Sequence, residues 1–124
     1  MFKRIDHLAL HVADAAAAAR FYADVLGFER VAERPGTQGF MIAYVRLGTT
    51  MLELTTRPGG EPMSGFHLAL EPEDFATAYG YLKDQGLEVL VEARRTTPRG
   101  AGEESAQRAV FRGPHGEMIE MRGR

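Results

Sequence analysis

The sequence has no cysteine, no long apolar run and no excess of one charge. The lack of cysteine excludes disulfide scaffolds, thiolate metal sites and cysteine nucleophiles. Lys and Arg number 15 and Asp and Glu 17, a formal charge of −2 that excludes a strongly basic nucleic-acid-binding protein. No apolar segment approaches the ~20 residues of a membrane span, and polar residues interrupt the stretch where a signal peptide would be apolar. The sequence therefore predicts a cytoplasmic protein without nucleic-acid or membrane partners.

The composition is otherwise that of an ordinary globular domain. The 124 residues are close to the commonest domain length, and 44% of them are hydrophobic. A chain of this size buries roughly two-thirds of its unfolded surface when it folds, which is enough for a core without cross-links. We therefore expect a single domain over residues 1–124.

An internal repeat organises the chain. Residues 7–10 and 67–70 both read His-Leu-Ala-Leu. Each copy is followed by an aspartate, a segment rich in alanine and aromatic residues, and a glycine, at nearly equal spacings. One shared tetrapeptide arises by chance, whereas this combination indicates two copies of one module. The two repeats span about 1–57 and 64–124.

Each repeat is predicted to have the order β-α-β-β-β. Alternating apolar residues indicate strands, and an N-capping aspartate followed by alanines and a final glycine indicates a helix. The elements expected in the first repeat are strand 5–12, helix 14–26, strand 28–33, and hairpin strands 40–47 and 50–56. Those expected in the second are strand 65–70, a helix from 72 or 74 to 85, and strands 87–92, 107–112 and 117–122. The segments 57–64 and 94–107, rich in Pro and Gly, are predicted to be loops.

Strand alternation places one histidine and one glutamate of each repeat on the same sheet face. His7 lies on the face of its strand that is turned away from the helix, and Glu53 occupies that face of the last strand. His67 and Glu120 repeat the arrangement. Because this face is not covered by the helix, we expect it to line a cleft.

Two imidazoles and two carboxylates form a donor set that suits a divalent metal such as Zn²⁺, Ni²⁺, Fe²⁺ or Mn²⁺. A glutamate on an otherwise apolar strand is costly to bury unless a metal, a cation or hydrogen bonds compensate. A single histidine or glutamate on a strand is more often packed or exposed than a ligand, but the duplication favours the ligand interpretation. The predicted metal ligands are His7, Glu53, His67 and Glu120.

Other polar residues are candidate substrate contacts. His11 lies on the same face as the first histidine, and pairing across the hairpin turn places Tyr44 and Arg46 beside the first glutamate. His115 lies in a turn, and we expect its side chain in solvent. Three arginines in the second predicted loop are expected either to stay in solvent or to contact an anionic substrate group: Arg94, Arg95 and Arg99.

Several segments resemble the vicinal oxygen chelate superfamily, which includes glyoxalase I, methylmalonyl-CoA epimerase, fosfomycin-resistance transferases, extradiol dioxygenases and bleomycin-resistance proteins. The segments that carry the resemblance are 5–10, 20–22, 25–28, 52–54 and 113–121. The resemblance implies an α+β fold in which two βαβββ modules form a half-barrel sheet around a metal cleft, with the helices on its outer face. It also implies a homodimer that shares its metal sites between chains.

The order His, Glu, His, Glu is most similar to bacterial-type glyoxalase I. By that resemblance, His7, Glu53, His67 and Glu120 hold one divalent metal per site, and Glu120 is the catalytic base with Glu53 as its catalytic partner. Extradiol dioxygenases and fosfomycin transferases keep three protein ligands, methylmalonyl-CoA epimerases usually carry Gln at the place of Glu53, and bleomycin-binding members lack the ligands. Four ligands therefore favour proton transfer by a glyoxalase-like lyase or isomerase on a small substrate with two vicinal oxygens.

Two positions depart from glyoxalase I. That enzyme tends to have Arg four residues after its first ligand and Asn four residues after its first glutamate, and both hold glutathione. This sequence has His11 and Arg57 there, and these two residues, with Tyr44 and Arg46, are the predicted substrate contacts. Glyoxalase I itself and a related lyase, isomerase or epimerase with a different substrate both stay open. A metal-dependent extradiol dioxygenase, an epimerase and a bleomycin-resistance-like sequestering protein stay open as alternatives.

Overall fold

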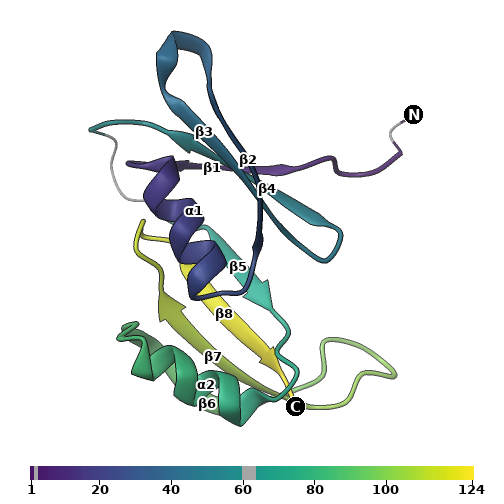
Figure 1. Cartoon of the computed structure of the whole chain (residues 1–124). Helices are drawn as coiled ribbons and strands as arrows, with labels where there is room; N and C mark the ends of the chain where they lie inside the picture. Colours follow the sequence, from purple (N-terminus) through teal and green to yellow (C-terminus); the bar gives the residue numbers. More distant parts are fainter. Residues whose placement is uncertain (2, 60–63) are drawn as a thin grey trace. The chain divides into compact units, whose positions relative to one another are not determined.

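The computed structural model describes residues 1, 3–59 and 64–124. These residues form an α+β fold of two compact units, Met1–Met63 and Ser64–Arg124. Each unit contains one α-helix and one four-stranded mixed sheet (Figure 1), so the predicted order β-α-β-β-β is confirmed in both repeats. Residues 60–63, which fall in the first predicted loop, lie outside the described residues.

The elements have the following bounds. The first unit contains β1 (Leu8–Val12), α1 (Ala15–Asp24), β2 (Glu29–Pro35), the 3₁₀ helix η1 (Thr37–Gly39), β3 (Met41–Leu47) and β4 (Thr50–Thr56). The second contains β5 (His67–Leu70), α2 (Phe75–Asp84), β6 (Val89–Thr96), β7 (Ala106–Arg112) and β8 (Met118–Gly123).

The two sheets have the same topology. Their strand orders are β1-β4-β3-β2 and β5-β8-β7-β6. In each sheet the first and last strands of the module pair in parallel, while the other neighbours are antiparallel. The first and last strands, which carry the predicted ligand segments, are therefore adjacent in each unit.

Both helices begin after the aspartate that the sequence predicts as their N-cap. The Asp14 carboxylate accepts a hydrogen bond from the Ala17 N–H at 3.0 Å, and the Asp74 carboxylate accepts one from the Thr77 N–H at 2.7 Å. These bonds satisfy N–H groups that have no partner within the first turn. The chain then leaves each helix through a glycine in the left-handed region, with φ of +76° at Gly27 and +80° at Gly86.

The core of the first unit lies between α1 and its sheet. Tyr22 is fully buried on the helix, and its ring meets that of Phe28 edge-on with centroids 5.3 Å apart. Leu10 and Val12 of β1 and Leu52 and Leu54 of β4 supply the sheet side of this core, as alternation predicts. In the second unit the buried side chains include those of Phe75, Leu82, Phe111, Ile119 and Met121.

Three sequence expectations are wrong in detail. The first strand begins at Leu8 rather than at residue 5, so His7 precedes it, and α1 ends at Asp24 rather than at 26. Arg94 and Arg95 lie on β6 rather than in a loop, because β6 continues to pair with β7 as far as Thr96. Their polarity suggested a loop, but the backbone pairing extends the strand.

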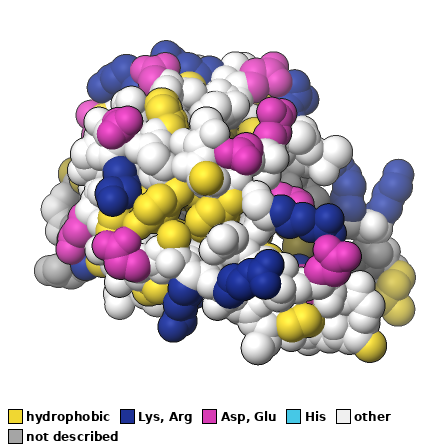
Figure 2. Space-filling model, turned by 90° about the horizontal axis from the view of Figure 1, so that it is seen from below, with side chains coloured by type: hydrophobic (Ala, Val, Ile, Leu, Met, Phe, Trp, Pro, Cys, Tyr) yellow, Lys and Arg dark blue, Asp and Glu magenta, His cyan; other side chains and the backbone are white. Residues whose placement is uncertain are grey.

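Charged side chains of both signs are interspersed on the surface in Figure 2, in keeping with the small net charge. No helix among the described residues is long and apolar enough to cross a membrane.

Candidate metal and substrate site

Glu53 is the polar residue at the centre of the first sheet. It lies on β4 between Leu52 and Leu54, which are fully buried. Since successive strand residues point to opposite faces, Glu53 points away from the apolar core. Its side chain is 20% exposed, so its carboxylate needs polar partners.

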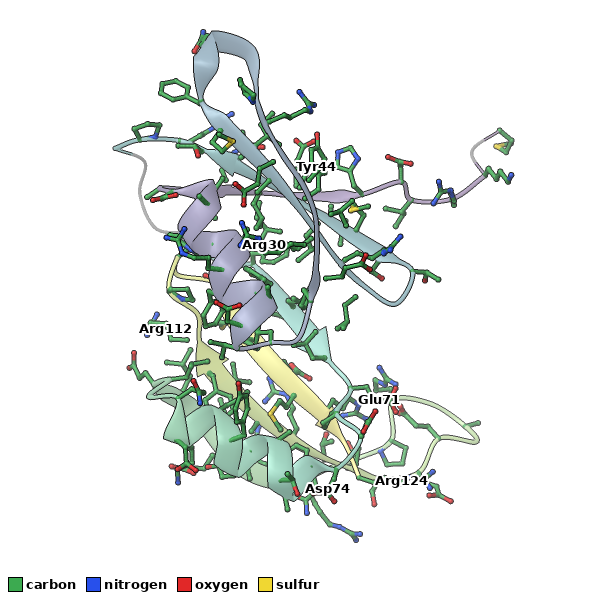
Figure 3. All side chains as sticks on the ribbon, viewed as in Figure 1. Arg30, Tyr44, Glu71, Asp74, Arg112 and Arg124 are labelled. Atoms are coloured by element: carbon green, nitrogen blue, oxygen red, sulfur yellow. The ribbon has the colours of Figure 1, made fainter. Side chains whose placement is uncertain are left out.

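Neighbouring hydroxyl groups supply those partners. Glu53 lies opposite Tyr44 on β3, as predicted, and the Tyr44 hydroxyl donates to its Oε2 atom at 2.8 Å. The Thr55 hydroxyl donates to Oε1 at 3.2 Å. Arg34 of β2 donates to the Tyr44 oxygen at 2.9 Å, and Figure 3 shows Tyr44 on this sheet. Both oxygens of the carboxylate are therefore oriented, and the cationic Arg34 polarises the Tyr44 hydroxyl.

His7 lies beside the same carboxylate. Its Nε2 atom is 3.8 Å from Oε2 of Glu53, and its Nδ1 atom is 3.1 Å from Oδ2 of Asp6. The hydrogen bond to His7, followed by the charge of Arg4, lowers the pKa of the Asp6 carboxyl. When Nδ1 donates to Asp6, Nε2 carries the lone pair of the ring and is the nitrogen that lies near Glu53. Histidines that bind metals are commonly fixed by a carboxylate in this way.

The two donor atoms of this pair are within reach of one divalent metal. Zn–N and Zn–O bonds are each about 2.0–2.2 Å long, so one ion can contact two donor atoms that are 3.8 Å apart. The imidazole nitrogen and carboxylate oxygen are also ligand types that Zn²⁺, Ni²⁺, Fe²⁺ and Mn²⁺ accept. In the first unit, the residues present are therefore compatible with the metal that the sequence predicts.

Glu120 occupies the equivalent place in the second sheet. It lies on β8 between the buried Ile119 and Met121, opposite Ala69 of β5, just as Glu53 lies opposite Ala9 of β1. Its neighbour differs, however, because its Oε2 atom is 3.1 Å from the guanidinium of Arg108. Its other carboxylate oxygen is of a ligand type that these divalent metals accept.

His67 is exposed at the start of β5, opposite Met118. Each unit therefore carries one predicted histidine ligand and one predicted glutamate ligand on its first and last strands or directly beside them. Across residues 1, 3–59 and 64–124, no three His, Asp or Glu side chains are grouped closely enough to hold a metal ion. The set of four ligands thus stays a prediction, supported within the first unit by the contact between His7 and Glu53.

The residues predicted to bind substrate lie around Glu53 or along its sheet. Tyr44 and Arg46 line a cavity of about 480 Å³ together with His7, and Arg46 forms a 2.7 Å ion pair with Glu29. Arg57 lines a second cavity of about 540 Å³. The exposed His11 lies on β1 opposite Thr55.

Sequence reasoning missed Arg34 and Arg108. Arg34 reaches Tyr44 from β2, and Arg108 reaches Glu120 from β7. Both contacts depend on register between strands that are separated in sequence. The available signal was the alternation of each strand, which puts these arginines on the polar face once the register is known.

Glu117 and His115 also differ from expectation. Glu117 is fully buried, and its carboxylate accepts a hydrogen bond from the His115 N–H at 2.9 Å. Within the described residues, the Nε2 atom of His115 is buried without a hydrogen-bond partner. The prediction that the His115 side chain lies in solvent is therefore wrong, because the turn folds over the Glu117 carboxyl. The same carboxyl lies so close to Gly113 that a side chain there would have no room.

Comparisons with known proteins agree with this architecture. A model of the glyoxalase/bleomycin resistance protein/dioxygenase superfamily matches residues 4–121. An ethylmalonyl-CoA/methylmalonyl-CoA epimerase from Cereibacter sphaeroides is 33% identical over 102 residues, which cover 73% of this chain and 76% of the epimerase. The mitochondrial methylmalonyl-CoA epimerase of Bos taurus is 29% identical over 109 residues, covering 78% of this chain and 62% of that protein.

A solved structure supports the same fold. The crystal structure of a glyoxalase family protein from Enterococcus faecalis superposes with a TM-score of 0.75. The alignment covers 98% of each chain at 23% sequence identity. This similarity supports the α+β arrangement with two βαβββ modules.

Proposed function

Because the chain belongs to the glyoxalase/bleomycin resistance protein/dioxygenase superfamily, we propose that it is a metal-dependent lyase or isomerase that moves a proton on a small substrate with two vicinal oxygens. The observation that carries this proposal is the pair formed by His7 and Glu53, with both carboxylate oxygens held by hydroxyl groups. Since two relatives are named as epimerases of substituted malonyl-CoA, epimerisation beside a thioester carbonyl is the first reaction to test.

The proposed ligands are His7, Glu53, His67 and Glu120. A bound divalent metal would supply Lewis acidity, which stabilises the negative charge that develops on substrate oxygens when a carbon-bound proton leaves. Asp6 fixes the His7 ring through Nδ1. Tyr44 and Thr55 hold the Glu53 carboxylate.

The two glutamates are the proposed acid–base pair. Glu120 removes the proton from the substrate carbon, and Glu53 is its partner on the other module. The different neighbours of the two carboxylates support separate roles, since hydroxyl groups hold Glu53 whereas the cationic Arg108 lies beside Glu120. General acid–base catalysis of this kind contributes about 10²–10⁴-fold to a rate.

The substrate contacts proposed for this enzyme surround Glu53. Tyr44 and Arg46 form part of a cavity wall next to His7, while His11 and Arg57 stand where glyoxalase I holds glutathione. Arg57 lines the neighbouring cavity with Thr55. Because His11 and Arg57 replace the residues that hold glutathione in glyoxalase I, we expect poor turnover of glutathione hemithioacetals.

We further propose that the protein is a homodimer that shares its metal sites between chains. The support within one chain is that His7 and His67, on the proposed metal-binding faces, are both solvent-exposed. Sedimentation at micromolar concentration should give twice the chain mass. A mass equal to one chain would reject the dimer.

The decisive experiment combines metal analysis with solvent deuterium exchange. The purified protein should contain about one divalent metal per ligand set, and His7→Ala should lose most of it. His11→Ala, which changes a neighbouring histidine outside the proposed ligand set, should retain the metal. Substituted malonyl-CoA thioesters, hemithioacetals and catechols are then offered in deuterated water, and we expect oxygen-independent incorporation of deuterium into product.

Two outcomes would favour the alternatives. Cleavage of a catechol ring under air but not under nitrogen would indicate an extradiol dioxygenase. Purification without metal, together with tight binding of an unreactive ligand, would indicate a sequestering protein, because an apolar binding cleft does not need four metal ligands.

A further inference from the structure

Three arginines form a row across the second sheet. Arg94 of β6 pairs with Arg108 of β7, which in turn pairs with Arg122 of β8. Cross-strand partners point to the same face. Glu120 is two residues from Arg122 and lies on that face as well, so the arginine row (Arg94, Arg108 and Arg122) borders the proposed catalytic base.

Such a row is electrostatically costly. Like charges directly opposite each other on neighbouring strands destabilise a sheet. The cost increases with burial, and the side chains of Arg108 and Arg122 are only 28% and 13% exposed. A row that persists despite this cost is compatible with a site that an anion completes.

The carboxylates nearby neutralise the arginines only in part. Among the described residues, Glu120 contacts Arg108 at 3.1 Å, and Glu103 contacts Arg122 at 3.4 Å. Glu103 is also paired with Arg99. The arginine row and Arg99 together carry four positive charges against these two negative charges.

The remaining charged groups around the row do not remove the excess. Arg124 and Glu104 form a 2.9 Å ion pair, and Glu71 lies near Arg124 at the ends of β5 and β8 (Figure 3). With Arg124, Glu104 and Glu71 included, five positive charges stand against four negative charges, which leaves one net positive charge. That excess grows if Glu120 is occupied as a metal ligand and no longer neutralises Arg108.

The row also adjoins space for a ligand. Arg122 of the row, Arg99 and Arg124 line a cavity of about 340 Å³, which Glu71, Glu103 and Glu104 also line. Arg94 and Arg108 are not among its lining residues. A guanidinium offers several N–H donors in a fixed planar arrangement that matches a carboxylate or phosphate. Room for a small oxyanion therefore lies at the Arg122 end of the row, where carboxylates share the lining with the guanidinium donors.

We propose that the arginine row binds an anionic oxygen group of the substrate, a carboxylate or a phosphate, beside Glu120. Arg108 is the central residue, because it exchanges its contact with Glu120 for the substrate anion. The anion site is independent of the reaction, but its role in selecting a substrate rests on the proposed function. It implies that this enzyme prefers substrates with an anionic group in addition to their two vicinal oxygens.

Isothermal titration of the full chain with malonate and with pyrophosphate tests this site. Both probes also chelate metals, so the protein is titrated as purified and again after dialysis against a chelator. Because Arg108→Met loses one charge-assisted contact, its affinity for the probe should fall by about 10-fold or more. The affinity of Arg94→Met should fall less. Arg20→Met, which removes an exposed charge from α1, should leave affinity unchanged.

The pattern of results identifies the ligand source. A loss confined to malonate identifies a carboxylate of the substrate, and a loss confined to pyrophosphate identifies a phosphate of its carrier group. If Arg108→Met and Arg20→Met bind both probes equally, or the unsubstituted protein binds neither, the proposal is wrong. Circular dichroism checks folding, and the exposed Arg94→Met variant decides the outcome if Arg108→Met unfolds.

The same preparations separate this inference from the proposed function. Anion binding that depends on Arg108, without bound metal or deuterium exchange, would retain the anion site and reject the metal-dependent proton transfer. Conversely, deuterium exchange that proceeds with equal KM in Arg108→Met and Arg20→Met would retain the proposed function and reject the role of the arginine row.

Discussion

The two units share one topology but pack their helices differently. On α1 the buried residues are Ala15, Ala18, Ala19 and Tyr22, none more than 1% exposed. On α2 they are Phe75 and Leu82, at 4% and 5%. Three alanines allow α1 to approach its sheet closely around one large ring, whereas α2 relies on larger side chains at its ends. The shared strand order therefore does not depend on one pattern of core packing.

The same comparison holds for the polar faces. Glu53 and Glu120 lie opposite Ala9 and Ala69 in equivalent parallel pairs. Neutral hydroxyl groups orient the first carboxylate, while the guanidinium of Arg108 contacts the second. The repeated backbone thus provides two equivalent positions, and the neighbouring strand determines the electrostatics of each.

The largest effect should come from exchanging each carboxylate for an amide. Glu120→Gln should lower turnover by about 10²–10⁴-fold while it retains metal, because an amide can coordinate weakly but cannot accept the proton. Glu53→Gln should cost less, since its proposed main role is that of a ligand. Turnover and metal content of both variants are compared. Equal losses of turnover would contradict the different roles of the two units.

A second test compares the helix cores. Tyr22→Ala should destabilise the protein by about 3–5 kcal/mol, the range of large aromatic truncations, because it removes a fully buried ring. Leu82→Ala should cost about 2–3 kcal/mol, because it removes a smaller side chain. Urea unfolding of both variants measures the difference. A larger loss for Leu82→Ala would show that α2 contributes more to the core than its burial indicates.

The third effect concerns the hydroxyl that holds Glu53. Tyr44→Phe removes the 2.8 Å hydrogen bond to Oε2, and loss of such a supporting contact typically weakens metal binding by about 10–100-fold. Chelator competition with Ni²⁺ or Zn²⁺ measures this affinity. Tyr81→Phe, which changes an exposed tyrosine on α2, is the matched control. Unchanged affinity in Tyr44→Phe would mean that this hydroxyl does not support a metal ligand.

The sequence predicts those features that depend on local order. The two-residue period of β4 places Leu52 and Leu54 in the core and Glu53 on the opposite face, and the short turn fixes Tyr44 as the partner of Glu53. The contacts made by Arg34 and Arg108 were not predictable in this way. They depend on side-chain reach across strands whose register is set by the whole sheet.

Polarity alone also misplaced part of the arginine row. Arg94 was expected in a loop because a polar segment with Pro and Gly follows it. In the sheet it pairs with Arg108, and long charged side chains are tolerated there because their ends reach polar surroundings. A polar segment therefore does not indicate a loop where one face of a strand is exposed to solvent.

The smallest effect is the pH-dependent contribution of Glu103, in the polar loop of the second unit, to the stability of the fold. Hydrogen bonds from the Arg99 side chain and backbone N–H, with the charges of Arg99 and Arg122, lower the pKa of Glu103 from 4.5 to about 2. Because the folded pKa is the lower one, this carboxylate stabilises the fold above about pH 4.5 and loses that contribution as the pH falls toward 2. Melting temperatures of the unsubstituted protein and Glu103→Gln should therefore differ at pH 7 and converge below about pH 3.

Glu104→Gln, which removes an exposed partner of Arg124, provides the matched control with a smaller difference. A gap between Glu103→Gln and the unsubstituted protein that stays constant from pH 7 to pH 2.5 would mean that the ionised Glu103 carboxylate does not stabilise this loop.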